Sequence, residues 1–313
     1  MVTGGALLFP GQGSQFAGMG KDLAAAFPEA RAVYDRADAA LAPLGFSVSR
    51  TSFEGTDEEL KQTAATQPVI VTHSIAVWEV LKARGAAPAA AAGHSLGEYA
   101  ALVAAGALSL EDAVVLVRRR GLFMQEAVPE GKGAMSAVIG LAPEEVAAAC
   151  AEAASETGEV CAAANFNSPE QTVVAGTAGA VAKAAEILKA KGAKRVLPLP
   201  VSAPFHCLLM KPAEEKLAPF LDATVFSPLA FPVVTNADAR PNSDPAAARE
   251  ALKRQICSPV RWLETVRHLA ATVPAAVECG PGTVLSGLAK RIARDWPVSA
   301  TSDTAGLAKL LPV

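Results

Sequence analysis

Short apolar runs alternate with longer helical stretches along this chain, and the alternation constrains its fold more than any other feature. The clearest strand and helix candidates are, in chain order, residues 6–9, 21–41, 67–84, 231–235 and 275–279. Strands that are separated by helices favour a parallel sheet covered by those helices. We therefore predict an α/β fold with a mostly parallel sheet.

Capping residues predict where several helices begin. Pro68 marks the start of the helix at 67–84, and Ser109 is the N-cap of the next helix. Ser258 and Pro259 predict a further start, as an N-cap and a first-turn proline.

The order of elements changes between residues 131 and 200. Four strand candidates and two helix candidates follow in the order βαββαβ, with Asn167-Ser168-Pro169 as the turn between the two central strands. This order is that of the split ferredoxin-like unit, which buries a small core of its own. We predict a ferredoxin-like subdomain at 130–199, inserted into a body formed by residues 1–129 and 200–313.

Composition excludes several classes of protein. Hydrophobic residues make up 51% of the 313 residues and the formal net charge is −3, so the chain folds and has no excess of positive charge for nucleic acid. The start of the chain lacks the basic residues of a secretory signal, and the apolar stretch at 99–110 is too short to span a membrane. The five cysteines contain no C-x-x-C pair, which predicts reduced thiols, no metal site and a cytoplasmic location.

One short motif carries candidate chemistry. Residues 93–97, Gly-His-Ser-Leu-Gly, match the G-x-S-x-G nucleophile elbow, in which Ser95 is raised on a tight strand-to-helix turn. Such a turn points the first N–H groups of the following helix at the same place, where they stabilise negative charge. The motif also arises by chance in glycine-rich chains, so it needs a partner.

A nucleophilic serine needs a base, and the chain has only four histidines. His73 and His268 lie in helix-like stretches, and His94 is adjacent to Ser95 on a turn that directs neighbouring side chains apart. His206 lies at a loop-to-helix junction after a strand, where functional residues concentrate. A helix-capping role is the alternative for His206.

Six sequence motifs occur in a fixed order along the chain. They are LFPGQGSQ at 8–15, GHSLGEY at 93–99, RGLFMQ at 120–125, NFNSP at 165–169, PFH at 204–206 and ECGPG at 278–282. Together they resemble the malonyl-CoA:acyl carrier protein transacylase family, from residue 8 to about residue 290. The resemblance implies an α/β-hydrolase-like body with a ferredoxin-like insert.

The resemblance also assigns roles to residues. It implies that Ser95 is acylated by the malonyl thioester, that His206 is the base, and that Gln12 and the Leu96 N–H form the oxyanion hole. Arg120 would pair with the malonyl carboxylate, for which a planar guanidinium is suited.

Helical spacing alone does not distinguish Arg120 from Arg118 and Arg119, for which a solvated basic face is the alternative. The match to the family arginine before Gly121 selects Arg120.

Three further residues complete the implied site. No acidic residue between the serine and the histidine stands out as an orienting partner, and in the family a backbone carbonyl near Gln255 holds the histidine. We therefore predict a Ser-His dyad with Gln255 in support. Met124 and Phe205 match pocket-wall positions, and Phe205 resembles the malonyl-selecting form.

The implied function is transfer of malonyl from malonyl-CoA to the phosphopantetheine thiol of acyl carrier protein, through a malonyl-serine and ping-pong kinetics, for fatty acid synthesis. No cofactor is implied, and we expect a monomer without nucleic-acid or membrane partners. The alternatives are a serine thioesterase or esterase, an acyltransferase of a polyketide pathway, and a non-catalytic module that binds a carrier protein.

Overall fold

Two separate β-sheets organise the protein in the computed structural model, which describes residues 3–201 and 203–311. The larger sheet has the order β10 (Val298–Thr301), β9 (Ala276–Cys279), β1 (Ala6–Phe9), β2 (Ala90–Gly93), β7 (Val233–Val234) and β8 (Pro241–Asn242). Its neighbouring strands are parallel except for β7 and β8. The predicted α/β fold with a mostly parallel sheet is confirmed.

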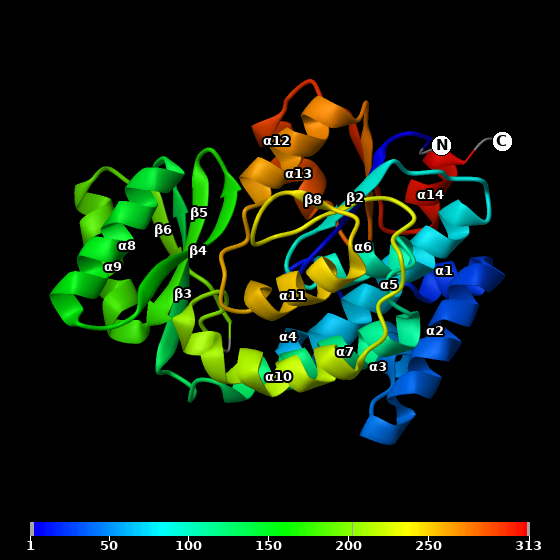
Figure 1. Ribbon diagram of the computed structural model, residues 1–313, viewed down its shortest axis with the longest axis horizontal. Coiled ribbons are helices and arrows are strands. Elements are labelled where there is room, and N and C mark those ends of the chain that lie inside the picture. The colour runs from blue at the N-terminus through cyan, green and yellow to red at the C-terminus, as the bar shows by residue number, and fades with distance from the viewer. Residues whose placement is uncertain (1–2, 202, 312–313) are drawn as a thin grey trace.

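Helices cover both faces of this larger sheet (Figure 1). The helices of this part of the chain, some of which pack on other helices rather than on the sheet, are α1 (Lys21–Ala26), α2 (Pro28–Leu41), η1 (Ala42–Leu44), α3 (Val48–Glu54), α4 (Asp57–Lys61), α5 (Thr63–Lys82), α6 (Gly97–Ala104), α7 (Leu110–Glu126), η2 (Leu208–Met210), α10 (Lys211–Ala223), α11 (Pro245–Gln255), α12 (Trp262–Thr272), α13 (Val284–Ile292) and α14 (Thr304–Leu310). Within the described ranges, no helix combines the length and the apolar character needed to cross a bilayer.

The alternation of side chains along β1 explains why helices are needed on both faces. Leu7 and Phe9 point into the core formed with α2, α5 and α7, whereas Ala6 and Leu8 point into the core formed with α12 and α13. All four side chains are fully buried. A parallel strand with two buried faces appears in the sequence as a continuous apolar run, as β1 does.

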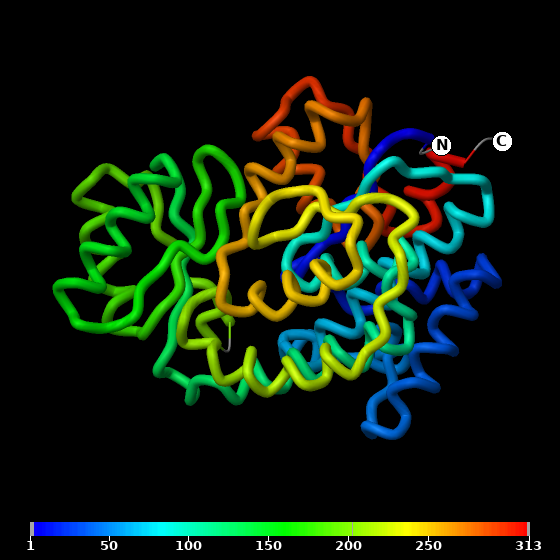
Figure 2. Tube along the Cα trace, in the orientation of Figure 1, coloured from blue at the N-terminus to red at the C-terminus, as the bar shows by residue number. Residues whose placement is uncertain are grey.

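The smaller sheet lies at one end of the molecule, where the chain leaves the body and returns to it (Figure 2). Its elements are β3 (Gly133–Ile139), α8 (Pro143–Thr157), β4 (Cys161–Ser168), β5 (Gln171–Thr177), α9 (Ala178–Ala190) and β6 (Arg195–Pro198). The strands are antiparallel in the order β4-β5-β3-β6, and α8 and α9 pack on one face over a separate apolar core. The predicted ferredoxin-like arrangement is therefore present.

Two predicted helix boundaries near the start of the chain are wrong. The helix predicted at 21–41 is two helices, because Phe27 is extended before Pro28, which begins α2. Pro68 lies inside α5 rather than at its start, since the helix already begins at Thr63. Burial of these first turns outweighs the helix-breaking tendency of the proline.

Two predictions later in the chain also need correction. Ser258 and Pro259 do not begin a helix, because the backbone of Val260 instead pairs with β4, and α12 begins only at Trp262. Asn167 and Ser168 belong to strand β4 rather than to a turn, so the turn lies at 169–170. The N-cap predicted at Ser109 is confirmed.

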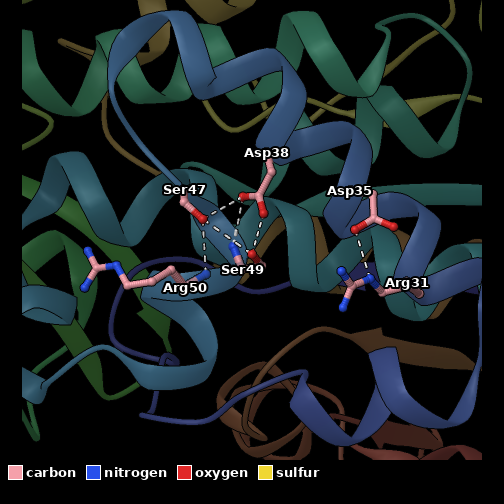
Figure 3. Close-up of polar contacts among 6 residues, drawn as sticks. All are labelled: Arg31, Asp35, Asp38, Ser47, Ser49 and Arg50. Atoms are coloured by element: carbon pink, nitrogen blue, oxygen red, sulfur yellow. Dashed lines mark hydrogen bonds and ion pairs between the residues drawn. The ribbon is translucent and has the colours of Figure 1, made fainter.

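Asp38 on α2 fixes the start of α3 (Figure 3). Its carboxylate accepts hydrogen bonds from the Ser49 N–H (3.0 Å), from the Ser49 hydroxyl and from the Ser47 hydroxyl (3.2 Å). Ser47 in turn caps α3 by accepting from the Arg50 N–H at 3.2 Å. A negative charge at a helix N-terminus is stabilising, so this contact ties α3 to α2.

Candidate active site

Ser95 sits on a strained turn between β2 and α6. Its φ is +51°, in the left-handed region that non-glycine residues rarely adopt. A Cβ at Gly93 would overlap the Gly97 backbone, and a Cβ at Gly97 would overlap the Phe9 carbonyl. Both glycines of the motif are therefore required by close backbone approach, as expected for a nucleophile elbow.

His206 lies within hydrogen-bond distance of this serine. Its Nε2 is 2.8 Å from the Ser95 Oγ, and its Nδ1 is 3.0 Å from the Gln255 carbonyl oxygen and 3.2 Å from that of Ser258. Carbonyl oxygens only accept, so Nδ1 carries the proton and Nε2 is free to accept from the hydroxyl. The family resemblance implied a backbone carbonyl near Gln255 as the partner of this histidine, and the Gln255 carbonyl lies there; the Ser258 carbonyl is an additional partner.

The surroundings of His206 keep its imidazole neutral. Burial lowers the pKa of His206 to about 3, and the positive charge of Arg120 contributes in the same direction. A neutral imidazole with an accepting Nε2 is the form that can take a proton from a serine.

The other three histidines have different partners. The Nε2 of His94 is 2.9 Å from the Asn167 Oδ1, and the Nε2 of His73 is 3.0 Å from the Ser302 carbonyl oxygen. His268 lies half-buried on α12. Choosing His206 from the sequence therefore agrees with the geometry.

Arg120 reaches the same serine from α7. One Nη donates to the Ser95 Oγ at 3.0 Å and to the Gln255 Oε1 at 3.0 Å, and the other donates to the Gln67 Oε1 at 2.9 Å. The side chain is only 1% exposed, and these partners are all neutral oxygens. A buried cation with neutral hydrogen-bond partners can pair with a carboxylate that enters the cavity.

The neighbouring arginines point elsewhere. The guanidinium of Arg118 lies 4.3 Å from the Phe46 ring centroid, and that of Arg119 lies 4.0 Å from the Phe220 ring centroid. Neither arginine lines the pocket around Ser95. Of the three arginines, the structure brings only Arg120 to the serine.

A cavity of about 230 Å³ opens onto Ser95 between the two sheets. Gln12, Leu96, Met124 and Phe205 all line it, so every remaining residue predicted for the site is present there. The smaller sheet and the segment after it add a partly apolar wall, formed by Met135, Ala137, Asn165, Asn167, Gln171, Val173, Leu199 and Val201. In the free protein the Gln12 Nε2 donates to the Thr63 Oγ1 at 3.3 Å.

Sequence reasoning missed Asn236, which supports the elbow. Its Oδ1 accepts from the Ser95 N–H at 2.6 Å and its Nδ2 donates to the Gly93 carbonyl at 2.6 Å. Asn236 follows the short strand β7, and nothing in its local sequence signals this contact across more than a hundred residues.

Glu98 was also missed, although it lies in the quoted GHSLGEY motif. Its Oε2 accepts from the Asn236 N–H at 2.9 Å and from the Gln255 Nε2 at 2.8 Å. Burial raises the pKa of Glu98 to about 7. A glutamate in the first turn of an otherwise apolar helix was the available signal.

Across the described residues, no group of three or more His, Cys, Asp or Glu side chains is placed to hold a metal ion. The five cysteines are free thiols.

A serine on a helix N-terminus, with a neutral imidazole and a guanidinium on its hydroxyl, has the geometry of a serine nucleophile. The chain belongs to the acyl transferase domain family, which matches residues 6–302.

Relatives within this family carry a more specific name. The chain is 49% identical over 312 residues to malonyl CoA-acyl carrier protein transacylase of Salmonella typhimurium, covering 99% of each chain. It is 48% identical to the protein of the same name from Bacillus subtilis, over 95% of this chain and 93% of that protein.

Solved structures with related names are similar to this chain in fold. An acyl carrier protein S-malonyltransferase from Vibrio cholerae is similar with a TM-score of 0.94 at 45% identity, covering 98% of this chain and 100% of that chain. A type II PKS acyl carrier protein in complex with its malonyl-transacylase gives a TM-score of 0.94 at 47% identity, covering 99% of each chain.

Proposed function

We propose that this acyltransferase moves a malonyl group from malonyl-CoA to the phosphopantetheine thiol of acyl carrier protein, supplying extender units for fatty acid synthesis. The observation that carries the proposal is the Ser95 hydroxyl, which contacts both His206 (2.8 Å) and Arg120 (3.0 Å) in one cavity. The names of relatives that are 49% and 48% identical over nearly the whole chain support it.

In the first half-reaction, the Ser95 Oγ attacks the thioester carbonyl carbon while its proton passes to the His206 Nε2. The carbon–sulfur bond then breaks, and His206 returns the proton to the coenzyme A thiolate. A malonyl ester on Ser95 remains. An imidazole suits both transfers because it can act as base and then as acid.

Developing charge is stabilised from two sides in this scheme. The oxyanion is bound by the Leu96 N–H at the start of α6 and by the Gln12 amide, once that amide turns from Thr63. The malonyl carboxylate pairs with Arg120. The negative charge of the malonyl carboxylate offsets the positive charge of Arg120, which lowers the pKa of His206. Substrate binding therefore makes His206 a stronger base.

The second half-reaction reverses these steps. The pantetheine thiol of the carrier protein gives its proton to His206 and attacks the ester carbonyl, and the Ser95 Oγ leaves and takes up the proton. One thioester is exchanged for another, so no cofactor is required, and a covalent intermediate predicts ping-pong kinetics.

Intact-mass analysis tests this function. We expect a malonyl adduct on the wild-type protein after mixing with malonyl-CoA, no adduct on Ser95→Ala, and loss of the adduct only after a pantetheine thiol is added. Rapid release of free malonate would instead indicate a thioesterase or esterase. Equal labelling and turnover of Ser95→Ala and wild type would indicate a non-catalytic carrier-binding module.

A polyketide pathway is the second candidate, favoured by the similarity to a malonyl-transacylase in complex with a type II PKS acyl carrier protein. A competition between a fatty acid carrier protein and a type II polyketide carrier protein, both loaded with phosphopantetheine, separates the two. Faster malonylation of the polyketide carrier would favour the second candidate.

We also propose the division of the chain into a body (1–129 and 200–313) and an inserted subdomain (130–199). The separate apolar core beneath α8 and α9 supports this division. We further propose that the protein is cytoplasmic, since free, mostly buried thiols are typical of a reducing compartment. We also propose that it is a monomer.

A further inference from the structure

Glu98 is a buried glutamate at the centre of the hydrogen-bond network behind the nucleophile. It is 1% exposed and lies on α6, three residues after Ser95. The proposed chemistry does not use it. Placing a carboxylate in the interior is costly unless its oxygens are bonded, so its contacts need an explanation.

One oxygen of Glu98 holds two residues from distant parts of the chain. Its Oε2 accepts from the Asn236 N–H (2.9 Å) and from the Gln255 Nε2 (2.8 Å). Asn236 accepts from the Ser95 N–H, and Gln255 donates to the Ser95 carbonyl at 2.9 Å. The strained serine backbone is thus fixed on both sides by residues that Glu98 positions.

Through Gln255, the contact made by Glu98 also affects His206 and Arg120. The Gln255 backbone carbonyl accepts from the His206 Nδ1, and its side-chain Oε1 accepts from Arg120. A shift of the Gln255 side chain would therefore disturb the guanidinium, and a shift of its backbone would disturb the imidazole.

Glu98 also balances charge. Arg120 is buried among neutral oxygens, and the negative charge of Glu98 raises the pKa of Arg120 against the effect of burial.

We propose that Glu98 is a positioning residue for acyl transfer, which holds Asn236 and Gln255 in place for Ser95, His206 and Arg120 and, when ionised, offsets the charge of Arg120. It touches neither substrate nor reacting atoms, and this inference rests on the proposed function. Two substitutions separate its two contributions. Glu98→Gln removes the charge but keeps an oxygen that can accept both hydrogen bonds, whereas Glu98→Ala removes both.

The experiment follows formation of malonyl-Ser95 in single turnovers by rapid quench and intact mass, which gives a rate constant independent of the active fraction. We expect Glu98→Ala to acylate about 100-fold more slowly than wild type, the scale of a misplaced reacting group. Glu98→Gln should recover most of that loss and lie within about tenfold of wild type, since its oxygen replaces the acceptor.

Steady-state kinetics provide a readout that a purely structural role would not move. At pH 8, above the raised pKa of Glu98, the Glu98→Gln variant should have a lower kcat and a lower KM for malonyl-CoA than wild type, because Arg120 attracts the malonyl carboxylate more strongly without a charge on residue 98. KM for acetyl-CoA, which lacks that carboxylate, should stay at the wild-type value.

Glu278→Gln is the control for loss of a buried carboxylate outside the cavity. Glu278 is fully buried and accepts from the Leu285 N–H and the Ser286 N–H on its two different oxygens, so the amide should cost stability here. The control should keep the wild-type acylation rate and both KM values.

Three results would overturn the inference: wild-type acylation by Glu98→Ala, equal impairment of both Glu98 variants, or an unchanged KM for malonyl-CoA in Glu98→Gln. If Glu98→Ala does not fold, Glu98→Gln decides alone, and wild-type kcat and KM would refute the role. Failure of the proposed function is distinguishable, because wild type itself would then form no adduct on Ser95, or would lose the adduct to water without an added pantetheine thiol.

Discussion

Arg120 donates a hydrogen bond to the Ser95 hydroxyl over 3.0 Å. The guanidinium that we propose to receive the substrate carboxylate therefore also contacts the nucleophile. A carboxylate that takes over this Nη would release the serine oxygen to His206 alone. Under the proposed function, substrate binding and activation of the serine would be coupled through one nitrogen.

Replacing Arg120 should therefore affect malonyl transfer far more than acetyl transfer. We expect Arg120→Ala to lower kcat/KM for malonyl-CoA about 100-fold or more, since loss of a buried charge pair costs about 2–5 kcal/mol. The acetyl group has no carboxylate, so its transfer should fall much less. Steady-state assays with both coenzyme A esters measure the ratio.

Arg119→Ala is the matched control for this experiment. Arg119 is the preceding residue on α7, but its guanidinium stacks on Phe220 outside the cavity. Both transfers should stay near the wild-type rate. Equal losses for malonyl and acetyl in Arg120→Ala would remove Arg120 from the specificity role.

Gln12→Ala should lower turnover by about 10²–10³, the usual cost of removing one oxyanion donor. KM for malonyl-CoA should change little, because the oxyanion exists only in the transition state. Gln15→Ala is the control for disturbance of the same loop, since Gln15 lies outside the cavity and bonds the Gly13 N–H and the Leu60 carbonyl; its turnover should fall much less than that of Gln12→Ala. A Gln12→Ala variant with unaltered kcat would argue against this donor.

Much of the fold could be predicted because its signals are local. Apolar runs gave β1 and β9, Ser109 gave the start of α7, and the βαββαβ order gave the smaller sheet. The errors lie where long-range contacts outweigh local preference. Val260 pairs with β4, so the serine and proline before it do not begin a helix.

The residues of the site likewise fall into those with a local sequence signal and those without one. Ser95 could be recognised because a nucleophile elbow requires glycines at fixed spacing, and only four histidines competed to be its partner. Arg120 needed the family resemblance, since helical periodicity did not separate it from Arg119. Asn236 could not be found from the sequence, because its role depends entirely on where the chain returns after β7.

The raised pKa of Glu98 predicts how stability should depend on pH. Its pKa rises from 4.5 to about 7 in the folded protein, so the unfolded chain loses this proton first, and the stability contribution falls as pH rises from 4.5 to 7. The Glu98→Gln side chain does not titrate, so the variant does not lose stability in this way as the pH rises. Its melting temperature relative to wild type should therefore be higher at pH 8 than at pH 5.

Thermal unfolding of both proteins between pH 5 and 8 measures this difference. The charged groups that act on Glu98 or respond to it are Arg120, Asp238, Arg254 and Tyr99, and all are retained in the variant. The depressed pKa values of His206 and His73 act in the opposite direction, but they are also common to both proteins. A difference that does not vary with pH would mean that Glu98 does not titrate in this range.

Asn236 should support activity through the backbone of the nucleophile. Its amide bonds both sides of the elbow, to the Ser95 N–H and the Gly93 carbonyl, and Ser95 is held at a φ of +51°. Strain of this kind persists only when neighbouring contacts maintain it. We expect Asn236→Ala to destabilise the protein by about 1–3 kcal/mol, the cost of buried groups left without partners, and to slow acylation of Ser95.

Asn236→Asp separates the two bonds, because its carboxylate can still accept from the Ser95 N–H but cannot donate to the Gly93 carbonyl. It should therefore acylate faster than Asn236→Ala if the serine N–H is the contact that matters. Denaturant unfolding and single-turnover acylation, compared with the surface variant Asn242→Ala, measure both effects. Acylation by Asn236→Ala at the wild-type rate would show that the elbow keeps its conformation without this amide, and that the glycines on either side of Ser95 suffice to hold the turn.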